Sequence, residues 1–122
     1  MFSKPVLIEL HYLPSVSYFS LLAGFNRLIV EKFEHYQKQS YRNRCYIKTA
    51  HGVEALIVPL TSKHGKTIIK DVRIDHGQKW LNNHWRTIQS AYGKAPFFEY
   101  YSHDLHSVLF TRYAFFYDLN FN

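Results

Sequence analysis

The segment 40–45, SYRNRC, holds the densest group of side chains that could bind an anion. Arg42 and Arg44 flank Asn43. A guanidinium binds carboxylate or phosphate through two parallel hydrogen bonds, and an asparagine amide recognises a neutral polar edge. In a strand the two arginines point to one face and Asn43 to the other, whereas in a bend the three converge. Residues 35–48 contain no acid, so we expect this segment to face an anion.

The net charge of +6 agrees with that expectation, because it is concentrated in one part of the chain. Residues 35–70 contain seven Lys or Arg side chains and one acid, Glu54. Such a local excess indicates an anionic partner or, equally, a solvated basic face. The fragment Gly65-Lys66-Thr67 is no P-loop, because Leu60 stands where that motif needs glycine. Lys63 and Lys66 could still meet a phosphate as point charges.

Two histidines are candidates for chemistry or binding. His11 lies at the end of the first predicted strand, and in α/β sheets ligands gather at the carboxyl ends of strands. A neutral histidine there can act as acid or base near pH 7, although a histidine bonded to a turn explains the position equally well. His84 lies on a predicted helix beside Trp80. Either it contacts a ligand or it packs at the edge of the core.

Length and composition restrict the class of protein. The 122 residues suit one domain, and 47% of them are hydrophobic, which excludes a disordered chain. The sequence contains no run of 18 apolar residues, so we expect no membrane span. The N-terminus is typical of a first strand rather than a signal peptide. Cys45 is the single cysteine, so no internal disulfide can form. A reducing compartment, the cytoplasm, is the expected location.

The elements that must position these residues begin with a strand, a helix and a second strand. PVLIELH (5–11) is predicted to be a buried strand, with Glu9 as its exception. Residues 15–25 show helical spacing of apolar side chains, with Ser15 as the N-cap. Residues 26–33 are a second strand. A short β-α-β opening of this kind favours a parallel pair of strands.

Three further elements are predicted downstream. Residues 42–49 and 53–60 form a β-hairpin with Gly52 in its turn, and TIIKDVRI (67–74) forms another strand. A helix then runs to Gly93, with Asp75 as its cap and Gln78 completing a capping-box pair. The fold class is therefore α/β: a mixed β-sheet with a βαβ-like start, a hairpin and packed helices in a single domain.

Several blocks, taken in order, resemble the WbqC-like family of bacterial proteins. HYLPSVSYFSLL (11–22) is similar to the family's opening block, and FEHYQKQSYRNRCYI (33–47) to its central Lys-x-x-Tyr/Trp-x-Asn-Arg block. In the central block the matching residues are Lys38, Tyr41, Asn43 and Arg44. LIVPL (56–60), residues 80–101 and FFYDLNFN (115–122) resemble later blocks. Together they cover nearly the whole chain.

This sequence departs from the family pattern in two places. Leu10-His11 stands where the family often has a Gln-Pro pair, so a role of that glutamine falls to His11 or is lost. The family also usually continues past the Asp-Leu-Asn region, here 118–120. We therefore expect residues 1–122 to be one WbqC-like domain that lacks the family's C-terminal helical part.

The resemblance implies a role in O-antigen or other surface-polysaccharide biosynthesis, as a sugar-tailoring transferase with an aminoacyl or glycyl group as the candidate for the group transferred. The expected ligand is an anionic small molecule such as a nucleotide sugar, without cofactor or metal. The alternative is a non-catalytic module that binds nucleotide, RNA or polysaccharide, with nucleic acid disfavoured because the basic signal is one block. In the transferase hypothesis His11 is the general base and Asn43 orients the acceptor. The ligand-binding set is Tyr12, Lys38, Tyr41, Arg42, Arg44, Trp80 and His84.

Overall fold

The computed structural model describes residues 4–37, 39–61 and 67–122. Three lysines that the sequence suggested as anion contacts lie outside the described residues: Lys38, Lys63 and Lys66. Gly65, of the rejected P-loop fragment, also lies outside them. The elements, in chain order, are β1 (Pro5–Ile8), α1 (Val16–Leu22), β2 (Arg27–Val30), β3 (Arg44–Thr49), β4 (Gly52–Ile57), the 3-10 helix η1 (Ile69–Asp71), α2 (Trp80–Tyr92), α3 (Phe98–Phe110) and α4 (Phe116–Phe121). The predicted α/β class is confirmed.

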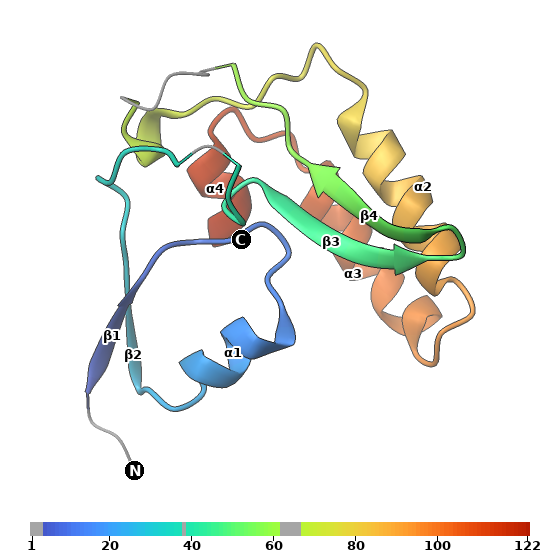
Figure 1. Ribbon diagram of the computed structural model, residues 1–122, viewed down its shortest axis with the longest axis horizontal. Helices are drawn as coiled ribbons and strands as arrows, with labels where there is room; N and C mark the ends of the chain where they lie inside the picture. Colours follow the sequence, from blue (N-terminus) through green and yellow to red (C-terminus); the bar gives the residue numbers. More distant parts are fainter. Residues whose placement is uncertain (1–3, 38, 62–66) are drawn as a thin grey trace.

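The chain opens with the predicted parallel pair. β1 pairs with β2 in parallel, so that Ile8 lies opposite Val30, and α1 connects the two strands (Figure 1). Ser15 caps α1 as predicted, because its side chain accepts a hydrogen bond from the backbone N–H of Tyr18. We call residues 5–30 the β1–α1–β2 unit.

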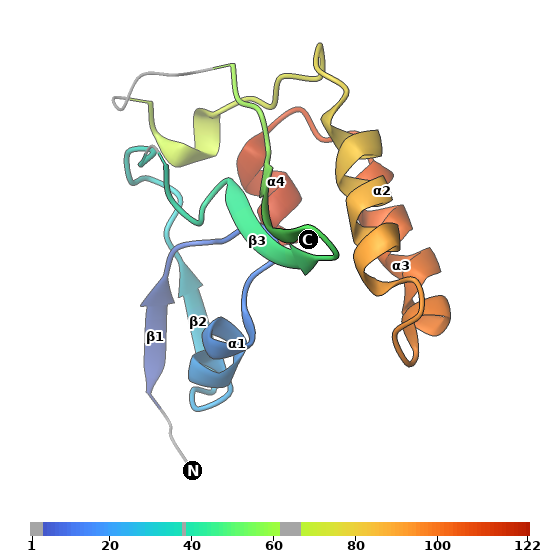
Figure 2. The same cartoon turned by 45° about the vertical axis from the view of Figure 1, so that its right-hand side comes forward.

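The prediction that residues 5–11 form a buried strand is wrong. β1 ends at Ile8, and Ile8 is its one buried residue, whereas the Leu7 side chain is 63% exposed. The sheet has two strands, and side chains of a strand alternate between its faces. α1 lies beside one face, and no side chain of α1 is itself buried (Figures 1 and 2).

The hairpin forms as predicted, as a second and separate sheet. β3 and β4 are antiparallel, and Thr49 pairs with Gly52 at the turn. Gly52 has a φ of 114°, a backbone conformation that other L-residues rarely adopt. α2 packs against β3, and α3 lies alongside α2 (Figure 2).

Residues 67–74 do not form the predicted strand. Ile68 pairs with His35 in a single bridge, and η1 follows directly. The backbone N–H of Ile69 donates to the Glu34 carbonyl at 2.7 Å. Ile69 and Val72 are both buried, and a spacing of three residues places them on one side of a 3-10 turn. Burial at this spacing replaces the strict alternation of a strand.

The prediction that Asp75 caps the following helix is also wrong. α2 begins at Trp80, and Lys79, at the N-cap position, makes no capping hydrogen bond through its side chain. The Asp75 carboxylate instead accepts hydrogen bonds from Gly77 N–H and from the Gln78 side chain, each at 3.0 Å. The two residues therefore stabilise a turn before the helix. Gly93 lies at the C-cap of α2, as predicted.

The core lies between the hairpin, α2 and α4. Its most completely buried side chains are Phe116, Val58 and Val72. The Phe116 ring packs edge-on against Tyr36, with ring centroids 6.4 Å apart, and its backbone N–H donates to the Val72 carbonyl. α4 therefore connects the C-terminal end of the described chain to the middle of the sequence.

Candidate functional site

His11 lies three residues past the carboxyl end of β1, rather than in the last position of the strand as predicted. Its Nε2 is 3.2 Å from a carboxylate oxygen of Glu9, two residues earlier. The pKa of Glu9 is lowered, mainly because the backbone N–H of Glu9 donates a hydrogen bond to the carboxylate. Burial raises this pKa, and the hydrogen bond with His11 lowers it further. The Glu9 carboxylate is therefore ionised near neutral pH and accepts the Nε2 proton. In that tautomer Nδ1 of His11 carries the lone pair, which is what a general base requires.

The backbone beside His11 is held in an uncommon conformation. Leu13 has a φ of 42°, in the left-handed region, immediately before Pro14. A non-glycine residue in that region costs about 1–2 kcal/mol, and such residues gather at functional sites. Two contacts hold this segment in place: the Tyr18 hydroxyl donates to the Glu9 carbonyl at 2.7 Å, and Tyr12 N–H donates to the Tyr41 carbonyl at 3.2 Å.

Aromatic rings surround His11. The Tyr18 ring lies 4.6 Å from the imidazole and the Tyr41 ring 5.9 Å, measured between ring centroids. Tyr46, on β3, packs edge-on against Tyr41 at 6.0 Å. Tyr41 and Tyr46 are exposed, so their rings are accessible to a ligand. The structure thus brings His11 and Tyr41 together, as the hypothesis required.

Two cavities meet at this segment. The first, which we call the aromatic cavity, measures about 560 Å³, and its walls are His11, Tyr12, Leu13, Pro14, Ser15, Ser17, Tyr18, Tyr41, Cys45 and Tyr46. Burial raises the pKa of the Cys45 thiol to about 11, so this thiol is protonated near neutral pH.

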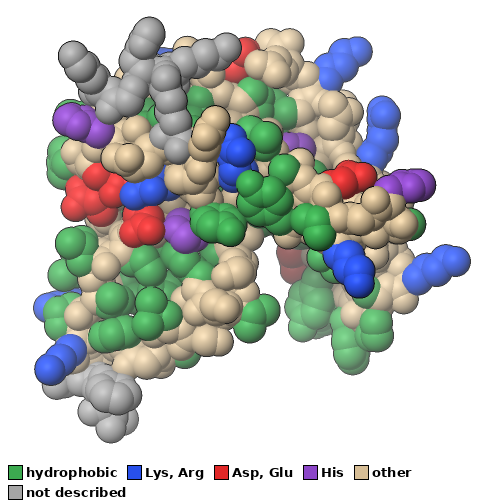
Figure 3. Space-filling model, in the orientation of Figure 1, with side chains coloured by type: hydrophobic (Ala, Val, Ile, Leu, Met, Phe, Trp, Pro, Cys, Tyr) green, Lys and Arg blue, Asp and Glu red, His purple; other side chains and the backbone are tan. Residues whose placement is uncertain are grey.

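The second, the aliphatic cavity, measures about 550 Å³ and lies between the β1–α1–β2 unit and the helices α3 and α4. Figure 3 shows a hollow between the part of the surface that carries α1 and the part that carries α3. The residues that line both cavities are His11, Tyr12, Leu13, Pro14 and Tyr18. A ligand in either cavity therefore meets the same short segment of chain.

Tyr12 connects this segment to the core. Its hydroxyl is 2.9 Å from Nδ1 of His84, and Nε2 of His84 is 3.1 Å from the Ile57 carbonyl. A carbonyl accepts only, so Nε2 carries the proton and Nδ1 accepts from Tyr12. Burial lowers the pKa of His84 to about 4, partly offset by the bond to Ile57, and burial raises the pKa of Tyr12. His84 is therefore a neutral, fully bonded histidine.

Trp80 and His84 lie away from the two cavities. The Trp80 ring packs edge-on against His84 at 5.2 Å, and both are buried. They line a different cavity, of about 360 Å³, between α2 and β4. Trp80 Nε1 is buried and has no hydrogen-bond partner among the described residues. Both residues contact Tyr12, which lines the two cavities.

The Arg42-Asn43-Arg44 segment is occupied largely by contacts within the protein. Arg42 forms an ion pair with Glu34, the residue immediately before the acid-free stretch. The Asn43 side chain donates to the Val58 carbonyl at 3.1 Å and is buried. Arg44 Nε is also buried, and within the described part of the chain it has no hydrogen-bond partner.

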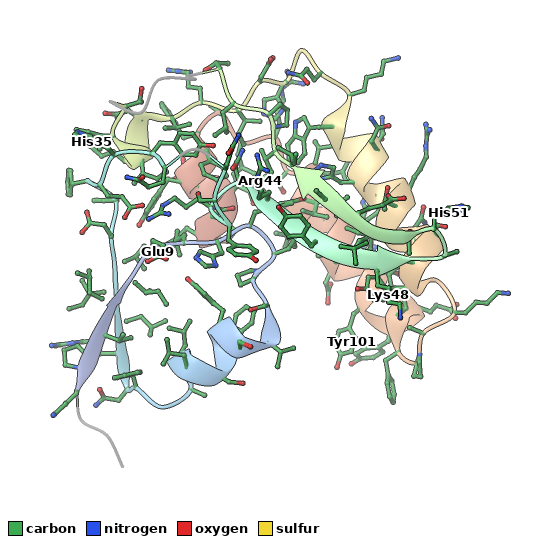
Figure 4. The ribbon with its side chains drawn as sticks, viewed as in Figure 1. Glu9, His35, Arg44, Lys48, His51 and Tyr101 are labelled. Carbon is green, nitrogen blue, oxygen red and sulfur yellow. The ribbon has the colours of Figure 1, made fainter. Side chains whose placement is uncertain are left out.

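The basic residues of the middle region do not gather at one place. Arg44 lies at the start of β3, whereas Lys48 and His51 lie toward the turn of the hairpin (Figure 4). Lys48 and His51 are exposed there. Among the lining residues of the aromatic and aliphatic cavities, all within the described ranges, there is no Lys or Arg.

Sequence reasoning missed four residues of the site. Glu9 had a signal, as a lone acid in an apolar strand. Tyr18 and Tyr46 had none beyond their aromatic type. Asn120 donates to the Arg42 carbonyl at 2.8 Å and lines the aliphatic cavity, a contact across 78 residues that no local pattern predicts.

No described residues suggest a metal site or a membrane span. Within residues 4–37, 39–61 and 67–122, no three His, Cys, Asp or Glu side chains are grouped so that they could hold a metal ion. No helix in these ranges has the length and apolar character needed to cross a bilayer.

The sequence comparisons assign the chain to a family. Residues 10–122 match the model of the WbqC-like protein family, and the chain belongs to that family. It is 34% identical over 98 residues to the protein named "Uncharacterized protein Rv1507c" of Mycobacterium tuberculosis (strain ATCC 25618 / H37Rv). That match covers 78% of this chain and 41% of the relative, so the chain spans about two fifths of the relative's length. No solved structure matches the chain.

Replacing Tyr12 by Phe tests the connection to the core. The change removes the hydroxyl that donates to His84 and leaves a buried nitrogen without a partner, so the free energy of unfolding should fall by about 1–2 kcal/mol. Urea denaturation followed by circular dichroism measures it. Tyr46→Phe, at an exposed ring, is the control and should change stability by less than about 0.5 kcal/mol. Equal effects of the two changes would contradict the role given to the Tyr12 hydroxyl.

Proposed function

We propose that this chain carries the acceptor site of a cytoplasmic sugar-tailoring transferase of surface-polysaccharide biosynthesis, with a glycyl group as the candidate for the group transferred. The observation that carries the proposal is the His11–Glu9 pair at the junction of two cavities. Tyrosine rings around it suit a sugar, because a pyranose presents apolar C–H faces that pack on aromatic rings. Family membership supports the sugar class through the resemblance described above.

In the proposed reaction His11 Nδ1 accepts a proton from a sugar hydroxyl or amine. The freed oxygen or nitrogen attacks the carbonyl carbon of an activated acyl donor, and a new C–O or C–N bond forms. The bond to the donor's leaving group breaks, and that group takes the electron pair. Glu9 holds the imidazole in the required tautomer and stabilises the imidazolium that forms. Glu9 is thus a positioning residue.

The roles given to the basic residues change in this proposal. Arg42 and Asn43 are bonded within the protein, so they support the hairpin rather than hold phosphate or orient an acceptor. Arg44 has a buried Nε without a hydrogen-bond partner within the described chain, and it lines neither cavity. Tyr41, with its exposed ring, is the principal ligand contact.

His11→Gln is the first test. A thermal-shift screen against nucleotide sugars, plain nucleotides and short RNA, at low and moderate salt, identifies the ligand, because a ligand of the folded state raises the melting temperature. With the selected sugar, we expect His11→Gln to lower the transfer rate about 10²–10⁴-fold, the usual contribution of a general base. The melting temperature should stay unchanged. His51→Gln, at the exposed turn of the hairpin, should retain full activity.

Two results would contradict the proposal. Unchanged transfer by His11→Gln would remove the base from the mechanism. A shift with every polyanion that disappears at moderate salt would indicate the non-catalytic binding module instead, because phosphate contacts release counterions and weaken steeply with salt.

A further inference from the structure

The aliphatic cavity is far more apolar than a sugar or phosphate requires. One wall comes from the β1–α1–β2 unit and the other from α3 and α4. The principal wall residues are Ile8, Leu28, Val30, Leu105, Val108 and Leu109. Leaving so large an apolar groove open to water is unfavourable, and such grooves in proteins usually mark binding sites.

The polar groups of this cavity lie in three of its lining segments. Apart from tyrosines, four hydrogen-bonding side chains line it: His11 at the junction with the aromatic cavity, Asp104 from α3, and Asn120 and Asn122 from the end of the chain. The rest of the wall is hydrocarbon and aromatic. Ligand pockets commonly combine a mainly apolar wall with a few polar groups that fix orientation.

Continuity between the cavities determines the kind of ligand. The segment from His11 to Pro14, with Tyr18, forms part of both walls. A molecule with a polar ring in the aromatic cavity and a hydrocarbon chain in the aliphatic cavity would therefore cross at His11. A nucleotide sugar would have to place a charged diphosphate or a nucleoside where no described lining residue is Lys or Arg.

We propose that the aliphatic cavity holds the hydrocarbon chain of an amphiphilic sugar ligand whose ring lies against Tyr41 in the aromatic cavity. This inference rests on the proposed function and narrows its substrate to a sugar that is joined to a hydrocarbon chain without a charged phosphate link, rather than a nucleotide-linked sugar. The chain, acyl or alkyl, is recognised through its apolar surface alone.

A chain-length series tests the inference. The probes are n-alkyl β-D-glucosides from methyl to octyl, each below its critical micelle concentration, titrated into the protein by isothermal calorimetry. We expect affinity to rise roughly fourfold for each methylene that enters the cavity. Equal affinity at all chain lengths, or no binding at any length, would overturn the inference.

Two neighbouring residues of β2 give a matched pair of variants. Leu28 and Ile29 are 47% and 46% exposed, but Leu28 lines the aliphatic cavity and Ile29, the next residue along the strand, does not. We expect Leu28→Gln to weaken octyl glucoside binding about three- to tenfold and to leave methyl glucoside unaffected. Ile29→Gln should change neither. Equal effects of the two variants would overturn the inference.

The oligomeric state separates a ligand cavity from a protein interface. Size-exclusion chromatography with light scattering measures the oligomeric state of the protein and of the two variants. If the protein is a dimer, and Leu28→Gln converts it to a monomer while Ile29→Gln does not, then the groove binds protein and the inference is overturned. The proposed function is judged separately. If the chain-length series fails while a nucleotide sugar binds and Tyr41→Leu abolishes that binding, the aromatic cavity keeps its role. If that binding is also missing, the proposed function fails too.

Discussion

Replacing Phe116 by Ala is expected to lower the free energy of unfolding by about 3–5 kcal/mol, the usual cost of removing a buried phenyl ring. Phe116 is 1% exposed and lies where α4 meets the core. Its ring contacts Tyr36, from a segment 80 residues earlier in the chain, so the cavity would open between distant segments that cannot easily collapse. Since small proteins are stable by about 5–15 kcal/mol, the loss is a large part of the total.

Phe121 provides the matched control for this measurement. It belongs to the same helix, α4, but is 62% exposed. Urea denaturation of Phe121→Ala should give a change of less than about 1 kcal/mol. Comparable losses for the two variants would mean that α4 contributes through its helical conformation rather than through the buried ring.

Mild acid is expected to destabilise the protein through His84. In the unfolded chain a histidine has a pKa of about 6.5, and in the folded protein the pKa of His84 is about 4. Between these values the unfolded state binds more protons, so stability falls as pH falls from 6.5 to 4. The loss is roughly 3 kcal/mol and is complete below pH 4, where both states are protonated.

The pH dependence is measured by urea denaturation at a series of pH values. His84→Gln removes the titrating group, and its stability should vary less with pH across this range, even though the variant is less stable. His51→Gln, at an exposed position, should retain the slope of the natural protein. A slope that His84→Gln leaves unchanged would show that other groups cause the acid destabilisation.

The parts of the fold predicted correctly depend on local chemistry. Ser15 caps α1 through its own hydroxyl, and Gly52 makes the hairpin turn with a conformation that suits glycine. The failure at 67–74 has a different origin. There the backbone of residues 67–70 forms hydrogen bonds with residues 32–36, and the backbone of residues 72–74 with residues 61, 114 and 116. Most of these partners are far away in sequence, and a 3-10 turn forms at 69–71 instead of a strand. No pattern within the segment itself contains that information.

The same distinction applies to the site. The position of His11 shortly after β1 follows from the order of a strand and a turn, and Tyr41 belongs to the block that the family resemblance indicated. Glu34 lies one residue before the acid-free stretch, and its carboxylate forms an ion pair with Arg42 inside that stretch. The hydrogen bond between Tyr12 and His84 spans 72 residues. Such pairings depend on tertiary packing, which spacing along the sequence does not reveal.

The weak burial of the β1–α1–β2 unit has a consequence for ligand binding. This unit supplies one wall of the aliphatic cavity, yet α1 buries none of its residues and β1 buries Ile8 alone. Segments with few buried apolar contacts open locally at lower free energy than the core does. A ligand that touches both walls would link the unit to α3 and α4 and suppress this opening. Binding and local folding are then coupled, so part of the intrinsic affinity is used to order the wall that makes the contact.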